Sequence, residues 1–357
     1  MHRLADDDVV ERHEDAQDAS RPPLVVLEPL TAFLDEAGLG SGRPEIAPIG
    51  EGHSNVTFVV GRGGEEFILR RPPRPPLPPS AHDVLREARV IGALAGRARV
   101  PEVLAVCDDE SVIGAPFFVM NRVDGEVITA QMPEALASEE ECRRTAEELI
   151  DALVELHGVD WQEAGLEGFG KPTGYLERQL RRFTGLWEHN RTREIPAVEK
   201  VGAWLATNMP QSGPATIVHG DYRLGNTIFA AQAPARLEAI LDWEMATIGD
   251  PLADLGYFAT LYVEAGDPQG GLFELSAVTR QPGFPSRAEL VARYEEGSGR
   301  SMTDITWYQT LALWKATVFM EGNYRRAVSG STDDPVLKAF GDGVLQLADS
   351  ALELTGG

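Results

Sequence analysis

Cysteine and lysine are scarce in this chain of 357 residues, and long apolar runs are absent. The two cysteines, Cys107 and Cys142, lie far apart and form no C-x-x-C pair, so we expect neither a disulfide framework nor a cysteine metal site. The strongest apolar run, residues 112–120, is too short to span a membrane. The N-terminal residues are acidic and lack the apolar core of a signal peptide. These absences together favour a protein of the reducing cytoplasm.

Negative charge dominates the composition, with 56 Asp and Glu residues against 32 Lys and Arg residues and a net charge of −24. A field of this sign repels nucleic acids and anionic membranes, and it could attract a cationic substrate. An acidic surface that simply keeps the protein soluble explains the same charge. We therefore expect no nucleic-acid or membrane partner, and charge alone identifies no substrate.

The chain is long enough for two domains, and its pattern changes from strand-rich to helix-rich near residue 121. Its first residues are polar, acidic and aperiodic, which is typical of a mobile tail. We divide the chain into a flexible acidic tail at 1–22, an N-terminal lobe at 23–120, a connector at 121–126 and a C-terminal lobe at 127–357.

The N-terminal lobe is predicted to be small and mostly β. After a first helix within 24–38, two strands joined by a glycine turn occupy 46–60, and further strands follow at 66–70, 100–107 and 112–120. A helix at 81–94 is inserted after the third strand. The C-terminal lobe is mainly helical, with short strands at 216–218, 227–229 and 239–241. The predicted class is α+β, with a five-stranded antiparallel sheet.

Three oxygen-bearing side chains follow two apolar segments of the C-terminal lobe. Residues 216–218 lead into Asp221 and, one loop turn later, Asn226, while residues 239–241 lead into Asp242. A carboxylate placed in this way can orient and deprotonate a hydroxyl, and an amide oxygen with a second carboxylate can hold Mg²⁺ against phosphates. Asp and Asn are also common in loops as turn residues. Two apolar strands that each lead into such side chains nevertheless favour phosphoryl transfer from ATP.

The same motifs carry a family resemblance. His219-Gly-Asp221-x4-Asn226, Asp242-Trp-Glu and Gly-Asp-Pro-Leu-Ala-Asp-Leu at 249–255 resemble the aminoglycoside phosphotransferase and choline kinase-like superfamily. Segments 67–73, 80–82 and 171–178 are similar to the branch with kinase domains fused to acyl-CoA dehydrogenases. The resemblance covers roughly residues 30–340. It is specific for phosphoryl transfer and much less specific for the acceptor.

The resemblance implies a bilobal protein-kinase-like fold with ATP between the lobes. Asp221 would be the catalytic residue, with Asn226 and Asp242 as Mg²⁺ ligands. Asp254 would brace the main chain of the catalytic loop. His219 would anchor that loop rather than act as a base, because Asp221 is better placed.

The nucleotide is expected to bind to the N-terminal lobe and to the connector, which would serve as a hinge. The glycine turn lies between two strands, where main-chain amides can approach phosphates, although an ordinary hairpin turn has the same composition. The connector would offer main-chain groups to the adenine edge. The expected contacts are Gly50, Gly52, Ser54, Asn55, Met120, Asn121 and Val123.

One position departs from the kinase pattern. Kinases generally place a lysine on the third strand, paired with a glutamate on the next helix. The first of the four lysines in this chain is Lys171, so the role falls to Arg70, paired with Glu87, or is absent. An arginine can bind a carboxylate and still reach phosphate, and arginine is usual here in the branch that the chain resembles. A purely structural arginine is the alternative.

The acceptor is expected to be a small molecule with a hydroxyl group. Only twelve positions separate Asp242 from Asp254 (254 − 242), which leaves no room for a peptide-docking segment. The candidates to bind the acceptor are Glu244, Tyr262, Trp314, Glu321 and Arg325. The helical spacing of the last three also fits a packing stripe.

Three functions fit these observations. The first is an aminoglycoside-type kinase, in which acidic residues meet a polycationic sugar. The second is a kinase for a metabolic hydroxy compound such as a hydroxyacyl-CoA. The third is a nucleotide-binding pseudokinase or regulatory module, which the missing lysine favours and the complete set of Asp221, Asn226 and Asp242 opposes. The acceptor, the choice between ATP and GTP, and the oligomeric state are left open.

Overall fold

The computed structural model describes residues 7–16, 21–49, 55–77, 82–268, 275–330 and 335–356. The chain divides into an N-terminal unit, Met1–Asp124, and a C-terminal unit, Gly125–Gly357. Their boundary falls within the segment 121–126 that we expected to connect two lobes. Within the described ranges, no helix has both the length and the apolar character that crossing a membrane requires.

A five-stranded antiparallel sheet in the order β3-β4-β5-β7-β6 forms the centre of the N-terminal unit. The predicted α+β class with a small antiparallel sheet is thereby confirmed. Gly63 and Gly64 make the tight β4–β5 turn with φ values of 61° and 88°, which residues with a Cβ rarely adopt. The elements of this unit are β1 (Val9–Val10), η1 (His13–Ala16), β2 (Val25–Val26), α1 (Leu27–Glu36), β3 (Glu45–Ile49), β4 (Val56–Arg62), β5 (Glu65–Arg71), α2 (Val84–Leu94), β6 (Val103–Cys107) and β7 (Phe117–Asn121).

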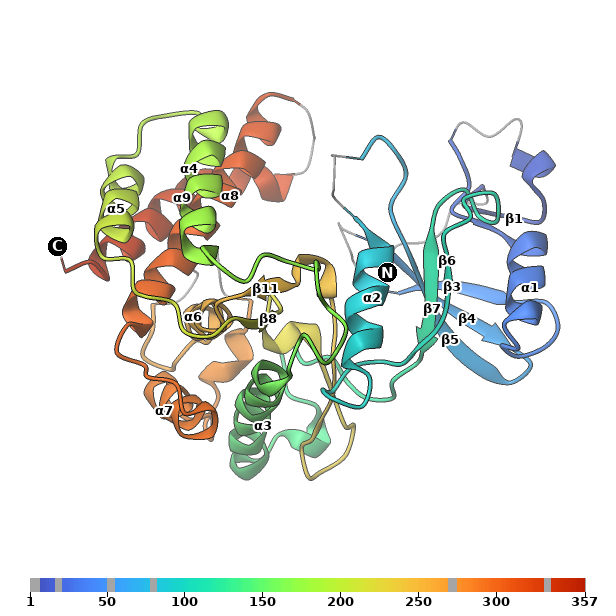
Figure 1. Ribbon diagram of the computed structural model, residues 1–357, viewed down its shortest axis with the longest axis horizontal. Helices are drawn as coiled ribbons and strands as arrows, with labels where there is room; N and C mark the ends of the chain where they lie inside the picture. The colour runs from blue at the N-terminus through green and yellow to red at the C-terminus, as the bar shows by residue number, and fades with distance from the viewer. Residues whose placement is uncertain are drawn as a thin grey trace. The chain divides into compact units, whose positions relative to one another are not determined.

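Helices α1 and α2 lie on opposite faces of this sheet (Figure 1). Successive strand residues point to alternate faces, so each strand contributes to two layers. Leu30 and Leu34 of α1 pack against Phe58 and Leu69 in a fully buried cluster. On the other face, Arg70 reaches the glutamate of α2 that is described below.

The expectation of a flexible tail over 1–22 is wrong for residues 7–16. Strand β1 pairs in parallel with β2, and η1 follows it. The buried Asp8 carboxylate forms an ion pair with Arg21 at 2.9 Å and a second with Arg74. These contacts give a polar, aperiodic segment an ordered place that hydrophobic periodicity does not reveal.

The predicted strand at 112–120 is also shorter than expected, because β7 begins only at Phe117. The N–H of Gly114 donates to the Glu110 carbonyl at 2.8 Å, which closes a turn, and Gly114 takes a φ of 82°. The apolar run therefore includes part of a turn as well as the strand.

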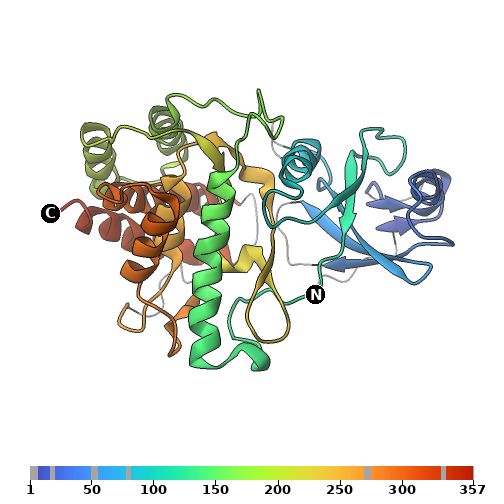
Figure 2. The same ribbon diagram turned by 60° about the horizontal axis from the view of Figure 1, so that its bottom comes forward.

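The C-terminal unit is mainly helical, with two short antiparallel strand pairs, β8–β11 and β9–β10. Figure 2 shows α3, in green, as one long helix. Its Asp151 binds Arg293 of α7 through two bonds of 2.7 Å. The elements are η2 (Glu134–Leu136), α3 (Glu139–Gly158), α4 (Tyr175–Asn190), α5 (Pro196–Thr207), β8 (Thr216–Val218), η3 (Leu224–Asn226), β9 (Thr227–Phe229), β10 (Leu237–Ile240), η4 (Trp243–Met245), β11 (Thr247–Gly249), α6 (Leu252–Leu261), η5 (Ala277–Arg280), α7 (Arg287–Ser298), α8 (Ile305–Val328) and α9 (Pro335–Glu353).

Helix α8 runs through the core of the C-terminal unit, against α4, α5 and α9. Two buried tryptophans attach it to α5: Trp307 donates its indole N–H to the Leu205 carbonyl, and Trp314 donates to the Val198 carbonyl, each at 3.0 Å. These bonds satisfy donors that burial would otherwise strand. One face of α8 is thereby fixed to its neighbours.

Candidate active site

A sharply bent loop follows β8 and carries Asp221. Strand β8 is buried and pairs with β11, which fixes the point where the loop begins. Gly220 adopts a φ of +90°, and a Cβ at this position would lie 2.9 Å from both the side chain and the carbonyl oxygen of Met245. Glycine therefore suits this bend as no other residue does, and Asp221 follows it in a partly exposed position.

The buried carboxylate of Asp254 holds the main chain of this loop. It accepts the N–H of His219 at 2.6 Å and the N–H of Gly220 at 2.8 Å. His157 lies 3.3 Å away through Nε2, and its Nδ1 lies 2.7 Å from the hydroxyl of Tyr294. Burial lowers the pKa of His157, and a neutral ring with its proton on Nε2 satisfies both partners. Burial opposes the charge on Asp254, but its hydrogen bonds, first with His157, hold the pKa of Asp254 below its ordinary value.

Three side chains contact the carboxylate of Asp221. Tyr257 donates its hydroxyl to Oδ1 at 2.6 Å, and Asn226 donates its amide to Oδ2 at 2.7 Å. The Nε atom of Arg223 lies 3.6 Å from Oδ1. Burial, followed by the charge of Asp221, raises the pKa of Tyr257, which keeps its hydroxyl protonated as a donor. The carboxylate is thus held in one orientation.

Main-chain bonds join this loop to the residue before Asp242. Nε2 of His219 donates to the Leu241 carbonyl at 2.8 Å, and the N–H of Leu241 donates to the Asn226 carbonyl at 2.8 Å. Asp242 itself has a left-handed backbone with φ 66°. Such a conformation costs a residue other than glycine about 1–3 kcal/mol and is concentrated at functional sites.

The donor set of these two loops suits a hard cation. The amide of Asn226 donates from Nδ2, so its Oδ1 can face a ligand, and Asp242 adds a carboxylate. Among the residues that the structure describes, no three His, Cys, Asp or Glu side chains converge on one point. Two oxygen donors without a full protein cage match Mg²⁺, which usually takes its other ligands from phosphates and water.

In the N-terminal unit, Arg70 of β5 binds the buried Glu87 of α2. The distance from Nε of Arg70 to Oε2 of Glu87 is 2.8 Å, and Arg70 also donates to Thr57 at 3.2 Å. Asn55 donates its amide to the same Glu87 oxygen at 3.1 Å. The structure therefore brings together three of the residues that the sequence predicted to contact a nucleotide.

The neighbouring Arg71 points to the other face of the sheet and has a different environment. It is almost fully buried and donates to the Pro72 carbonyl at 2.9 Å, the Ile113 carbonyl at 3.2 Å and the Leu24 carbonyl. Burial lowers the pKa of Arg71 to about 10. Arg71 thus has a structural role, whereas Arg70 has the glutamate partner.

The connector residues differ in whether their main-chain groups already have partners. Met120 and Asn121 end β7, and the N–H of Asn121 donates to the Glu102 carbonyl at 2.9 Å. The N–H and carbonyl of Val123 bond to no residue in the described ranges. Val123 is therefore better placed than Asn121 to offer main-chain groups to a base. The remaining predicted contacts, Gly50, Gly52 and Ser54, lie outside the described residues.

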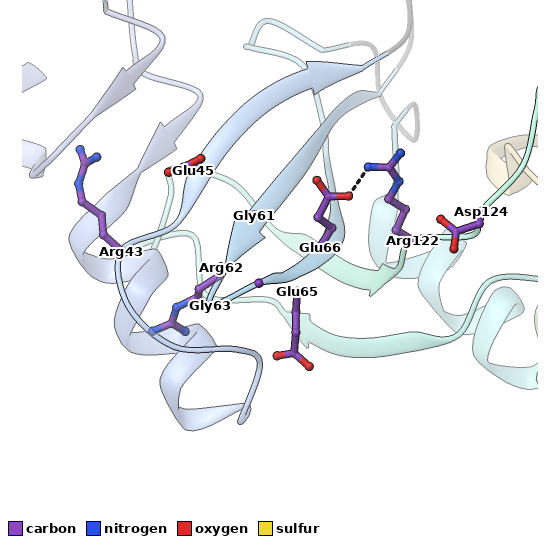
Figure 3. Close-up of a pocket in the computed structure, with 10 residues that line it drawn as sticks. Arg43, Glu45, Gly61, Arg62, Gly63, Glu65, Glu66, Arg122 and Asp124 are labelled. Carbon is purple, nitrogen blue, oxygen red and sulfur yellow. Dashed lines mark hydrogen bonds and ion pairs between the residues drawn. The ribbon is translucent and has the colours of Figure 1, made fainter.

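An open hollow of about 530 Å³ lies beside the β4–β5 turn (Figure 3). Its lining mixes both signs of charge, and the charges largely satisfy one another: Arg122 forms an ion pair with Glu66, and Arg62 donates to the Gly42 carbonyl at 2.6 Å and forms an ion pair with Asp35. None of the residues predicted to bind a nucleotide or a metal lines it. We therefore do not assign the active site to this hollow.

A second cavity, of about 350 Å³, lies in the C-terminal unit and has Asp221 in its wall. Most of its lining is apolar or aromatic. Seven lining residues come from α8 at positions that recur every three or four residues, which is one face of a helix. They are Tyr308, Leu311, Ala312, Lys315, Ala316, Phe319 and Met320.

Of the residues predicted to bind the acceptor, only Glu244 lines this cavity. Tyr262, Trp314, Glu321 and Arg325 do not, and each has its polar group hydrogen-bonded elsewhere in the C-terminal unit. Trp314, Glu321 and Arg325 lie on other faces of α8, and Tyr262 caps the C-terminal end of α6. Their contacts agree with the packing stripe that we considered as the alternative.

The sequence analysis missed Tyr257, Arg223 and Lys315. Tyr257 lies three residues after Asp254 on α6, so it shares a helix face with a residue that was already singled out. Lys315 lies seven residues after Tyr308 and four before Phe319, on the stripe of α8 that lines the cavity. Helical periodicity counted from Tyr308 instead of Trp314 would have found Lys315.

A family model described as the phosphotransferase enzyme family matches residues 45–301. Acyl-CoA dehydrogenase family member 11 of Gallus gallus is 34% identical over 324 residues, which are 88% of this chain and 41% of that protein. Acyl-CoA dehydrogenase family member 10 of Mus musculus is 33% identical over 319 residues, 88% of this chain and 29% of that protein. The chain thus spans less than half the length of these curated relatives.

Solved structures share the fold. A crystal structure from Ralstonia eutropha, provisionally named an aminoglycoside phosphotransferase, is 30% identical with a TM-score of 0.79, covering 92% of this chain and 98% of the other. A thermostable mutant of aminoglycoside phosphotransferase APH(4)-Ia, in ternary complex with AMP-PNP and hygromycin B, has a TM-score of 0.61 at 16% identity, covering 92% of this chain and 99% of the other. These findings confirm the resemblance indicated by the motifs and the kinase-like fold.

Replacing Glu321 tests its assignment to packing. Its buried carboxylate accepts the N–H and hydroxyl of Thr192 at 2.9 and 2.6 Å and lies 3.4 Å from Arg193. Glu321→Ala should lower the free energy of unfolding by about 2 kcal/mol, because it removes the hydrogen bonds that the buried carboxylate accepts from Thr192 and the ion pair with the half-buried Arg193. Urea denaturation followed by circular dichroism measures this. Glu199→Ala, which breaks an exposed ion pair with Arg191, should cost less than about 1 kcal/mol. Equal midpoints for the two variants would contradict the assignment.

The stability of the chain should depend on pH through Lys315. Burial lowers the pKa of Lys315 from 10.5 to about 8 in the folded protein. Between about pH 8 and pH 10 the unfolded chain therefore holds a proton that the folded chain has lost, and stability should rise with pH. Lys315→Met should be more stable than wild type at pH 7, and the gap should narrow above pH 8. Urea midpoints of the two proteins across this range provide the measurement.

Lys200→Met provides the control, because it removes a lysine charge at an exposed position of α5 and is measured at the same pH values. A gap between wild type and Lys315→Met that does not change with pH would show that Lys315 titrates as an ordinary surface lysine.

Proposed function

The chain belongs to the phosphotransferase enzyme family, and from this premise we propose that it transfers the γ-phosphate of ATP to a hydroxyl group of a small molecule, with Mg²⁺ as cofactor. The observation that carries the proposal is the setting of Asp221. Its carboxylate forms part of a cavity wall, on a loop that Asp254 holds by two main-chain bonds. A carboxylate fixed at the edge of a cavity can meet a hydroxyl group that enters it.

Asp221 would orient the acceptor hydroxyl and receive its proton as the oxygen attacks phosphorus. Tyr257 holds one oxygen of the carboxylate and Asn226 holds the other. The carboxylate would therefore need little reorientation when the acceptor binds. Arg223, near Oδ1, adds a positive charge beside the position where phosphate oxygens would arrive.

Asn226 and Asp242 would hold Mg²⁺ through oxygen atoms, and the bound ion would neutralise part of the phosphate charge. The backbone supports that role, because the N–H of Leu241 donates to the Asn226 carbonyl and so joins the two segments that carry the ligands. Asp242 directly follows Leu241 and has a left-handed backbone. The protein itself would position the two ligands, with the Asn226 nitrogen donating to the Asp221 carboxylate and the Asn226 oxygen left for the ion.

The N-terminal unit would bind the nucleotide. Arg70, held by Glu87, would contact the α- and β-phosphates in place of the usual lysine. Val123 would offer main-chain groups to the adenine edge, since these groups have no partner among the described residues. A module that binds nucleotide without turnover is the competing proposal, and the complete set of Asp221, Asn226 and Asp242 speaks against it.

The acceptor would be a small molecule rather than a protein. The interval between Asp242 and Asp254 is filled by η4, β11 and the start of α6. Each of these short elements packs within the C-terminal unit, and Trp243 and Ile248 are fully buried. This interval, which the structure describes throughout, therefore contains no long loop that could serve as a peptide-docking segment.

Replacement of the proposed base should abolish most turnover. Asp221→Asn keeps the shape of the side chain but removes the proton acceptor, so we expect kcat to fall by about 100- to 10,000-fold with little change in the KM for ATP. ADP release with Mg-ATP, measured across a panel of hydroxylated acceptors, tests this. Asp349→Asn, at an exposed position of α9, is the matched control and should behave as wild type. Equal activity of Asp221→Asn and wild type on every acceptor would exclude the proposed role.

Arg70 should prove to be a nucleotide contact rather than only a structural partner. Arg70→Ala should raise the KM for ATP by about ten- to a hundred-fold, because a charge-assisted hydrogen bond to phosphate is lost. Arg70→Lys, which retains the charge, should recover most of that loss. A melting temperature measured on each variant separates the two roles: if Arg70→Ala lowers the melting temperature and leaves the KM unchanged, the arginine is structural only.

A further inference from the structure

The cavity beside Asp221 is chemically unlike a site for a polycationic sugar. A cationic polyol needs several carboxylates with free lone pairs, and the carboxylates here are largely committed. Both oxygens of Asp254 accept main-chain N–H groups, and both oxygens of Asp221 accept bonds from Tyr257 and Asn226. Glu244 is the one other carboxylate in the described lining, so the acidic capacity for a ligand with many ammonium groups is small.

The mouth of the cavity is apolar. Three lining residues, Met245, Leu275 and Phe319, are 52%, 43% and 63% exposed, and they are among the few large apolar side chains that the described part of the chain leaves exposed. Apolar side chains gathered at the rim of a cavity mark a surface that an apolar ligand covers. The walls continue this character inward through Leu311 and Phe183.

Two cations of the described residues line this cavity, and Arg223 is paired with Asp221. Lys315 lines the cavity from the centre of the α8 stripe, and its Nζ atom lies 4.9 Å from the ring centre of Phe183. Within the described ranges, this ring is the sole partner recorded for the ammonium group, which forms no hydrogen bond or ion pair there. The charge of opposite sign that acts most on it is that of Asp254, which forms no ion pair with it. A partly buried ammonium group without a direct ion pair destabilises the free protein, and it would gain a direct partner when an anion binds.

We propose that the acceptor is a hydroxylated amphiphile with an anionic group: its apolar chain fills the cavity, its hydroxyl meets Asp221, and Lys315 binds its carboxylate. This inference rests on the proposed function for the identity of the reacting group, but the binding that it describes needs no nucleotide. Lys315 is then the residue that determines specificity, since it selects an anionic acceptor over neutral and cationic ones of the same length.

The test compares ligands that differ only in charge. The probes are monohydroxydecanoates with the hydroxyl at different carbons, the corresponding decanediols, an aminodecanol and the cationic aminoglycoside hygromycin B. Binding to the whole chain is measured by isothermal titration calorimetry without nucleotide, and phosphate transfer is measured separately with Mg-ATP. We expect at least one hydroxydecanoate to bind at least tenfold more tightly than its diol, and hygromycin B to bind more weakly than both.

Lys315→Met supplies the decisive comparison, because it retains the length and apolar stem of the side chain and removes the charge. Its affinity for the hydroxydecanoate should fall about tenfold or more, while its affinity for the diol should stay within a factor of about three. Lys200→Met, at an exposed site on α5, should bind both as wild type does. The proposal would be overturned if Lys315→Met retained the full preference for the acid. It would also be overturned if the wild type preferred the diol, the amine or hygromycin B.

The two readouts separate this inference from the proposed function. Charge-selective binding that Lys315→Met abolishes, without transfer of phosphate to any acceptor, would support the acceptor class and contradict the phosphotransferase proposal. Transfer to hygromycin B, with Asp221→Asn inactive, would support the phosphotransferase proposal and overturn the acceptor class.

Discussion

The bonds from two consecutive main-chain N–H groups to the carboxylate of Asp254 fix the geometry on which the site depends. The loop that carries Asp221 bends at Gly220, where the backbone has no intrinsic preference for one shape. Asp254 belongs to the rigid helix α6, and its two hydrogen bonds hold the loop in a single conformation. His157 and Tyr294 extend the network to α3 and α7, so several elements of the C-terminal unit position one carboxylate. Without these bonds the loop could move, and the Asp221 carboxylate would lose the fixed orientation that phosphoryl transfer needs.

The sequence predicted the features that depend on local patterns. The strand before Asp221 follows from an apolar run, and the Arg70–Glu87 pair follows from the kinase pattern of a basic residue on the third strand with a glutamate on the next helix. Both are present. The carboxylate partners of Asp221 were recoverable only in part: Asn226 comes from the same loop, whereas Tyr257 reaches it across 36 residues. Periodicity within one element reports on that element, and a contact between two elements depends on how they pack.

The residues predicted to bind the acceptor illustrate the same limit. Trp314 and Lys315 are adjacent in sequence, yet a step of one residue rotates a helix by about 100°, so the two side chains serve different surfaces. Trp314 packs against α5, and Lys315 faces the cavity. Trp314 and Glu321 were chosen as candidates because one is large and the other is charged. Large and charged residues also attach a helix to its neighbours, provided that each buried polar group has a hydrogen-bond partner. The residues that shape the cavity are mostly small or aliphatic and therefore inconspicuous.

The division of α8 into two faces also bears on how such a protein can diversify. Its tryptophan face anchors the helix to the core, whereas its cavity face includes the small residues Ala312 and Ala316. Changes of volume at these two positions would reshape the cavity without touching the loop that Asp254 holds. Under the proposed function, descendants of this sequence could exchange one acceptor for another through a few substitutions along a single helix stripe, while the chemistry of phosphate transfer stayed the same.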